Sequence, residues 1–304
     1  MAPPASYPAM GTLVILNPTA GGRKDPDALQ RRLEPWIDGD FVSTRGPGEA
    51  VGLASEAARS GYESVVAVGG DGTVREVATG LHLGGAAPRL GIIPAGTGND
   101  LAWCLGIPAA IERAAAVATD GRTAALDLVQ ASRLAAYDEP RYLVNAAVAG
   151  FGGRIGDAMT PAFRRRFRRI AYPLAALGQV RDLRPYSIRV EVDGRGMDAK
   201  ALMVVVANGE YAGGRIRFVP GASTGDGLLD LVVVHAVSPG RLATLIPRVL
   251  SGRHPGTTGI SMYRGASVRI HADRDMWINL DGDTWQPGPA GFRVLPAALR
   301  VAVP

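Results

Sequence analysis

Cysteine is almost absent from this sequence, since its 304 residues include one, Cys104. A single cysteine excludes an internal disulfide framework and a metal cluster built from several cysteines, so we expect a reducing, intracellular compartment. Uninterrupted apolar runs of the roughly 18 to 20 residues that a membrane-spanning helix needs are also absent. The residues before Gly11 lack the basic and apolar regions of a secretory signal, and we expect no such signal.

Two common nucleotide-binding motifs are missing as well. The first apolar run is not followed by G-x-G-x-x-G, and G-x-x-x-x-G-K-[ST] is not found. A Rossmann dehydrogenase and a P-loop ATPase are therefore disfavoured. Charge of one sign is in modest excess, with 33 basic against 28 acidic residues, a net charge of +5 and a pI near 9.6. This excess fits an anionic partner, whether a nucleotide, a nucleic acid or an acidic membrane surface, and does not choose among them.

The first part of the chain alternates between short apolar runs and amphipathic segments. The runs predict strands at 12–16, 41–43, 64–68 and 90–93. The amphipathic segments predict helices at 27–36, 49–60 and 74–82. Continuous apolar runs are typical of strands that are buried on both faces, and their alternation with helices predicts a parallel α/β sheet.

After about residue 127 the pattern changes to β-like segments separated by turns such as Asp193-Gly194. The segments are 141–147, 187–192, 201–207, 228–235, 267–271 and 276–280, with helical exceptions at 155–183 and 241–250. We therefore expect two domains. The first is a parallel-sheet, nucleotide-binding α/β domain over 11–125, with 291–304 as a candidate to rejoin it. The second, over 126–290, is a mainly antiparallel β-sandwich domain.

Three glycine-rich turns follow three of the predicted parallel strands, at 17–22, 69–73 and 94–100. In open α/β sheets, ligands bind outside the carboxyl ends of the strands. Glycine lets the backbone approach a phosphate closely, and the following helix offers amide groups and a positive dipole end. Thr73 and Thr97 add hydroxyl donors, while Asp71 and Asp100 are able to hold a divalent cation that bridges to the phosphate. These features together favour a nucleotide site over ordinary strand-to-helix turns.

These turns resemble a known family. GGDGT at 69–73, P-x-G-T-x-N-D at 94–100 and the leading N-P-x-x-G-G are similar to the diacylglycerol kinase catalytic domain, most closely to the bacterial soluble lipid kinases. The resemblance implies that ATP is the phosphoryl donor and Mg²⁺ its cation. By the same resemblance, Asp71, Asp100 and Asp127 would organise the catalytic Mg²⁺, partly through water, although a solvated strand-end carboxylate is an equal alternative for Asp127. The implied ATP-binding residues are Asn17, Thr44, Gly69, Gly70, Asp71, Gly72, Thr73, Val74, Arg75 and Thr97.

The second domain carries two further family signatures. The segment from Asn208 to Asp230 resembles the loop that holds a structural Mg²⁺ in bacterial members, which implies Asp226 and the carbonyls of Ser223 and Leu228 as ligands. The alternative is an Asp-Gly turn without metal. The segment 279–283 resembles the family's D-G-E segment, whose glutamate is the proposed general base. Asp283 stands at that position, one methylene shorter, and we take it with Asp71 as the candidate catalytic pair.

A basic stretch joins the apolar pattern of 155–183. Its arginines are Arg164, Arg165, Arg166, Arg168 and Arg169. Arginines beside an apolar stripe are typical of a helix on an anionic membrane surface, and a helix packed on the second domain with a solvated basic face is an equal alternative.

We therefore expect an ATP- and Mg²⁺-dependent lipid kinase, with diacylglycerol as the first candidate acceptor. The alternatives are a kinase of a soluble acceptor, as in the NAD kinases that share GGDGT, and a nucleotide-binding regulatory protein without turnover. The expected partners are a lipid at an anionic membrane surface and no nucleic acid, with a homodimer left open. The expected location is cytoplasmic, peripheral to the inner face of the membrane.

Overall fold

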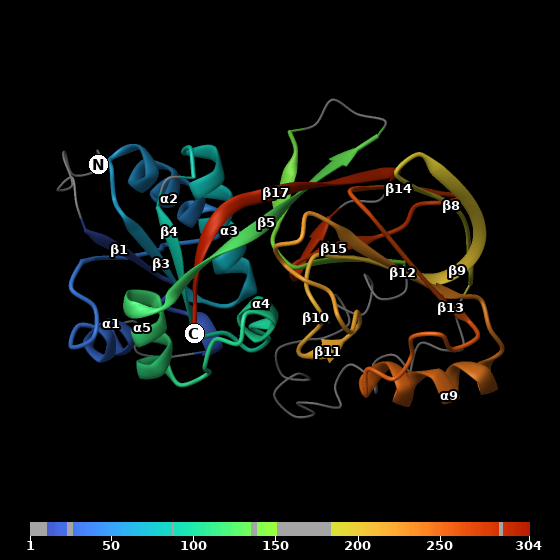
Figure 1. Ribbon diagram of the computed structural model, residues 1–304, viewed down its shortest axis with the longest axis horizontal. Helices are drawn as coiled ribbons and strands as arrows, with labels where there is room; N and C mark the ends of the chain where they lie inside the picture. The colour runs from blue at the N-terminus through green and yellow to red at the C-terminus, as the bar shows by residue number, and fades with distance from the viewer. Residues whose placement is uncertain (1–10, 23–26, 87, 135–138, 151–183, 286–287) are drawn as a thin grey trace. The chain divides into compact units, whose positions relative to one another are not determined.

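The computed structural model describes residues 11–22, 27–86, 88–134, 139–150, 184–285 and 288–304 (Figure 1). The chain forms two compact units, Met1–Leu128 with Pro296–Pro304, and Val129–Leu295. Two long strands, β5 (Arg122–Arg133) and β17 (Ala290–Val303), contribute residues to both units.

The first unit is built on a parallel sheet. Its strands, in the spatial order β4, β3, β1, β2, are Arg89–Pro94, Ser64–Gly69, Thr12–Leu16 and Asp40–Ser43. The end of β17 joins β4 in parallel, with Arg300 opposite Arg89. Every residue of β3 is buried, as expected of a strand with both faces covered. The predicted parallel α/β architecture is confirmed.

Helices and a short 3₁₀ turn connect these strands. They are η1 (Ala20–Gly22), α1 (Ala28–Leu33), α2 (Glu49–Arg59), α3 (Asp71–Leu83), α4 (Asp100–Cys104) and α5 (Ile111–Asp120). The helix predicted at 74–82 begins three residues earlier, because Asp71 and the residues after it already have helical conformation. The last three residues of GGDGT, 71–73, therefore lie in the first turn of α3.

The second unit is antiparallel, as predicted. Its strands are β6 (Arg141–Leu143), β7 (Ala146–Gly150), β8 (Tyr186–Val192), β9 (Arg195–Ala207), β12 (Leu229–His235), β13 (Ile260–Gly265), β14 (Ser267–Ala272), β15 (Ile278–Leu280) and β16 (Asp283–Trp285), with the small pair β10 (Tyr211–Ala212) and β11 (Ile216–Arg217). Asp193 and Gly194 form the tight β8–β9 turn with positive φ angles of 47° and 80°. Such angles are typical of a hairpin turn whose twist matches the strands.

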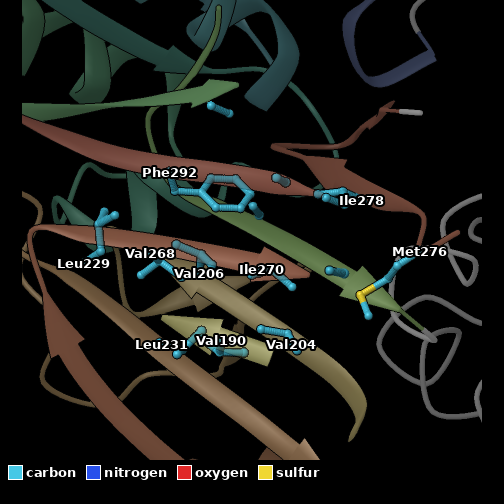
Figure 2. Close-up of a cluster of buried hydrophobic side chains, with 14 of the residues drawn as sticks. Val190, Val204, Val206, Leu229, Leu231, Val268, Ile270, Met276, Ile278 and Phe292 are labelled. Atoms are coloured by element: carbon cyan, nitrogen blue, oxygen red, sulfur yellow. The ribbon is translucent and has the colours of Figure 1, made fainter. Parts of the chain in front are cut away.

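Two hydrophobic clusters stabilise this unit. Figure 2 shows one of them, in which side chains of β8, β9, β12, β14, β15 and β17 pack together around Val204, Val268 and Phe292. The other cluster lies beneath helix α9 (Pro239–Leu250), whose Leu245 packs with Val205, Val232 and Ile260. Helix α9 therefore covers one face of the β9–β12–β13 sheet.

Candidate active site

In the first unit, three turns meet at the carboxyl ends of adjacent strands β1, β3 and β4. Asn17 follows β1, and its amide Nδ2 donates to Thr73 Oγ1 after β3 at 3.1 Å. Asn17 Oδ1 accepts hydrogen bonds from the backbone N and the Oγ1 of Thr19, at 3.0 and 2.9 Å. These bonds fix the direction of the Asn17 side chain, so the first two predicted turns are joined by one oriented amide.

The Asp71 carboxylate joins the other two turns. Its Oδ2 accepts a hydrogen bond from Asn99 N at 2.8 Å, and its Oδ1 accepts one from Asp100 N at 2.7 Å. Asn99 has a left-handed conformation at the start of α4 and makes no side-chain cap to that helix. Asp71 therefore takes the role of the capping carboxylate from a different turn, because helix N-termini leave amide groups that an acidic oxygen satisfies.

Glycines at the β3 and β4 turns allow the two backbones to touch. A Cβ added to Gly96 would overlap the Cα of Gly70, and one added to Gly98 would lie 2.7 Å from Asp71 Oδ2. Asn99 closes its own turn, since Gly96 N donates to Asn99 Oδ1 at 3.0 Å and Asn99 Nδ2 donates to Gly96 O at 2.9 Å. These glycines are thus required by packing of the protein on itself, whatever ligand the turns bind.

The remaining predicted nucleotide residues differ in exposure. Thr97 is exposed and Thr44 half-buried, while Thr73 and Val74 are buried within α3. Thr44 lies after β2, where its backbone N and its Oγ1 both donate to Leu16 O, at 2.8 and 3.3 Å. The described structure therefore groups Asn17, Thr44 and the GGDGT and GTGND turns along the edge where β1 to β4 end.

Two predicted metal carboxylates of this unit are buried. Asp100 is 7% exposed, and its backbone N donates the hydrogen bond to Asp71 Oδ1 described above. Asp127 is 1% exposed, and its Oδ1 accepts a hydrogen bond from Ala297 N at 2.7 Å. The Asp127 carboxylate thus stabilises the meeting of β5 and β17, a contact between segments far apart in sequence.

In the second unit, Asp281 and Gly282 form the two-residue turn between β15 and β16, with φ angles of 47° and 99°. The turn is tied back by Gly282 N, which donates to Asn279 Oδ1 at 2.9 Å. Asp283, the candidate base, opens β16 and is exposed to solvent. The hairpin therefore presents Asp283 on a short, rigid support.

The neighbouring carboxylate, Asp281, points inward. It is 8% exposed and accepts backbone hydrogen bonds from Val144 at 2.7 Å, Asn145 at 3.3 Å and Ala146 at 2.8 Å. Val144 and Asn145, whose amides point at this carboxylate, belong to neither strand, while Ala146 begins β7. The expected single strand at 141–147 is therefore wrong, and β6 and β7 are separated at residues 144 and 145.

Two buried asparagines complete this anchor. Asn145 Nδ2 donates to Tyr211 O at 2.7 Å, and Asn208 Nδ2 donates to Val144 O at 2.9 Å. Asn208 stands in the family-like signature, but Asn145 and Asp281 were not predicted as site residues. The D-G-D pattern by itself does not indicate which of its two carboxylates is buried.

The predicted structural metal loop is held by an arginine in this structure. Asp226 Oδ1 accepts a hydrogen bond from Leu228 N at 3.1 Å, and its Oδ2 is hydrogen-bonded to Arg264. Arg264 also lies 3.5 Å from Asp230 Oδ1. Burial raises the pKa of the Asp230 carboxyl. The negative charge of Asp226 adds to this increase, and the positive charge of Arg264 opposes it.

No group of three or more His, Cys, Asp and Glu residues arranged to hold a metal occurs within the part of the chain that the structure describes. The predicted membrane arginines, Arg164, Arg165, Arg166, Arg168 and Arg169, lie outside the described residues. Over the residues that are described, no helix has the length and apolarity to cross a membrane.

Comparisons with known proteins cover both units. Residues 11–131 match the diacylglycerol kinase catalytic domain, and residues 145–303 match the YegS C-terminal NAD kinase beta sandwich-like domain. The chain is 31% identical to the protein named Probable lipid kinase YegS of Escherichia fergusonii, over 99% of this chain and 97% of the relative. It is also 31% identical to the Probable lipid kinase YegS-like protein of Citrobacter koseri, with the same coverage.

A solved structure shares the fold. It is a diacylglycerol kinase from Bacillus anthracis, with a TM-score of 0.79, 25% sequence identity and 97% of each chain covered.

Proposed function

The chain belongs to the diacylglycerol kinase catalytic-domain family of lipid kinases, and from that membership we propose that it transfers the γ-phosphoryl group of ATP to a lipid hydroxyl. Diacylglycerol is the first acceptor to test, with phosphatidic acid as the product. The observation that carries the proposal is the interlocking of three glycine-rich turns by Asn17 and Asp71 at one sheet edge. Ligands of open α/β sheets bind outside the carboxyl ends of the strands, and the start of a helix there favours an anion.

The nucleotide phosphates would lie against the first turn of α3 and the GTGND turn. Helix α3 begins at Asp71, and its first amides and positive dipole end favour an anion there. A Cβ added to Gly72 would meet nothing within 4 Å, so space is open at this backbone position. Thr97 and Asn17 offer donors at the same edge.

Mg²⁺ fits the chemistry of the Asp71 and Asp100 donor set, which is all oxygen. Both Asp71 oxygens already accept hydrogen bonds from backbone amides, which suits contact with the cation through water. When bound, the cation would neutralise charge on the transferring phosphoryl group. For the second-unit site, the Arg264 bond to Asp226 competes with a cation, and a structural Mg²⁺ there requires the guanidinium to move away.

Asp283 would serve as the base. The acceptor hydroxyl gives its proton to the Asp283 carboxylate while its oxygen forms a bond to the γ-phosphorus, and the bond from that phosphorus to the β,γ-bridging oxygen breaks to release ADP. The exposed position of Asp283 at the start of β16 is compatible with contact to an external lipid. Its support by the buried Asp281 anchor limits movement of the hairpin.

Substitution of Asp283 tests this assignment. We expect Asp283→Asn to lower kcat by 10²-fold or more, the order of a lost general base, with ATP affinity retained. Asp283→Glu restores a carboxylate and is expected to keep most of the activity. An Asn variant that turns over like the wild type would show that another group, or none, takes the proton. Transfer to a soluble alcohol but to no lipid would favour the NAD-kinase-like alternative.

A further inference from the structure

The outer face of helix α9 combines apolar side chains with arginines and carries no acidic residue. The helix begins after Ser238, whose side chain caps Arg241 N, and its inner side packs on the sheet through Leu245. The exposed positions of its outer face are Gly240, Arg241, Ala243, Thr244, Pro247, Arg248 and Leu250. A solvated surface helix usually carries mixed charged and polar residues on this side. Here the outer face holds apolar or small side chains, one threonine and two arginines.

Basic residues outnumber acidic ones in the chain segment that carries this surface. Between Asp230 and Asp273 the sequence has no aspartate or glutamate, while it has five arginines. Arg264 and Arg269 lie near the carboxylates of Asp226 and Glu191. Arg241, Arg248 and Arg253 take part in none of the ion pairs recorded among the described residues.

These three arginines are held on one ordered support. Arg253 N donates to Arg248 O at 2.8 Å, so the turn after α9 folds back onto the last turn of the helix. The turn is fixed in the core by His254, which is fully buried and hydrogen-bonded to Phe218 O at 2.8 Å. Arg241 Nη2 donates to Thr258 O at 3.3 Å, which ties the first turn of α9 to the same loop.

Exposed apolar area lies among these charges. Leu250 is 41% exposed at the end of the helix, and Ala243 and Pro247 precede it on the outer face. Figure 1 shows α9 on the outside of the unit, beyond β13. Apolar side chains flanked by arginines that form no recorded ion pair in the described part of the chain are complementary to a surface with negative head groups above a hydrocarbon interior.

We propose that the outer face of α9, with Arg241, Arg248, Leu250 and Arg253, is a docking surface for an anionic lipid bilayer. The proposal deepens the proposed function and rests on it, because a kinase of lipid hydroxyls must work at a bilayer surface. Head-group phosphates would contact the three guanidinium groups, and Leu250 would enter the acyl boundary. Arginine suits this role because its planar fork binds phosphate oxygens in pairs.

Vesicle binding tests this surface without any need for catalysis. The probes are vesicles of phosphatidylcholine alone, and of phosphatidylcholine with 30% phosphatidylserine or 30% phosphatidylglycerol, in sedimentation without ATP. Each basic residue near such a surface contributes about 1 kcal/mol. The triple variant Arg241→Gln/Arg248→Gln/Arg253→Gln is therefore expected to bind anionic vesicles on the order of 100-fold more weakly than the wild type.

Matched controls separate this surface from net charge and from folding. Arg59→Gln/Arg113→Gln/Arg195→Gln removes the same charge from exposed positions elsewhere and is expected to change binding by a few-fold at most. The corresponding triple lysine variant of the α9 set keeps the charge and is expected to keep most of the binding. A wild type that ignores anionic vesicles, or an equal loss in the two glutamine triples, would overturn the proposal. Equal binding to both anionic lipids would identify surface charge rather than one head group as the ligand.

A fluorophore gives a second, direct measurement. Because Cys104 is the sole cysteine, Cys104→Ser with Leu250→Cys accepts one environment-sensitive label on α9, and Cys104→Ser with Leu83→Cys accepts it on an exposed leucine of α3. We expect a blue shift with anionic vesicles for the label at 250 and none for the label at 83. Vesicle binding without a shift at 250 would assign docking to another surface. Transfer to water-soluble dioctanoylglycerol reports the kinase proposal separately, since the glutamine triple on α9 should retain it.

Discussion

Replacement of Asp281 by asparagine is expected to destabilise the protein, although it only exchanges one carboxylate oxygen for an NH₂ group. The carboxylate accepts amides of three successive residues, with Oδ2 toward Val144 and Asn145 and Oδ1 toward Ala146. An asparagine has one acceptor oxygen, so in either orientation its NH₂ group faces at least one buried backbone N–H. The variant therefore loses a charge-assisted bond and leaves a donor unsatisfied at an 8% exposed site.

The magnitude follows from these losses. Hydrogen bonds to charged groups contribute roughly 1.5 to 3 kcal/mol, and an unsatisfied buried donor costs about 1 to 3 kcal/mol. The two ranges partly describe the same lost contact and are not added in full, so we expect a decrease of about 3 kcal/mol in the free energy of unfolding. For a unit of this size that corresponds to a Tm lower by roughly 6 to 12 °C.

Calorimetry of Asp281→Asn beside Asp283→Asn checks the reasoning with an internal control. The two residues belong to the same turn, but Asp283 is exposed, so its amide variant should change stability by less than about 1 kcal/mol while it loses kinase activity. An Asp281→Asn protein whose Tm stays within measurement error of the wild type would refute the anchoring role of Asp281.

Two further predictions concern other contacts. Gly96→Ala places a Cβ against Gly70 Cα and 2.9 Å from Asn99 Oδ1, so we expect a loss of roughly 1 to 3 kcal/mol in the free energy of unfolding and weaker ATP binding. A Cβ at Gly72 meets open space, so Gly72→Ala should not lower the Tm. Equal Tm values for the two variants would contradict this reasoning. Burial alone would raise the pKa of the Glu210 carboxyl. Arg217 Nη2, 2.8 Å from Glu210 Oε1, and the Gly221 backbone N both donate to this carboxylate, and together they hold its pKa below the usual value. A carboxyl group whose pKa is lower in the folded state than in the unfolded state stabilises the protein above the unfolded pKa. This stabilisation is lost as the pH falls through the folded pKa. Glu210→Gln should therefore cost about 1 kcal/mol near pH 7 in urea unfolding, with the difference from wild type vanishing on acidification; a constant difference would exclude a charged Glu210 as its source.

Much of the fold could be predicted because burial acts locally on the sequence. The continuous apolar run of β3 has every residue buried, and the alternation of β8 follows its exposure pattern of one face in and one face out. The start of α3 was missed because glycine and aspartate indicate a turn, whereas Asp71 both begins the helix and caps α4.

What could not be predicted depends on contacts between distant residues. The break between β6 and β7 is caused by Asp281, more than 130 residues later in the chain. Likewise, the Asp127 contact with Ala297 and the Arg264 bond to Asp226 join segments that no local pattern relates. The three glycine-rich turns were found because each has its own motif, while their joining by Asn17 and Asp71 required the structure.

The most direct test of the central proposal is phosphoryl transfer from γ-labelled ATP to a panel of lipids in mixed micelles with Mg²⁺ and anionic lipid. The panel includes diacylglycerol, phosphatidylglycerol and a sphingoid base, with glycerol and NAD as soluble acceptors. We predict that label enters a lipid, with diacylglycerol first, and that Asp283→Asn lowers the rate of this transfer by about 10²-fold or more. ATP binding without label in any lipid would contradict the proposal and favour a soluble acceptor or a nucleotide-binding protein without turnover.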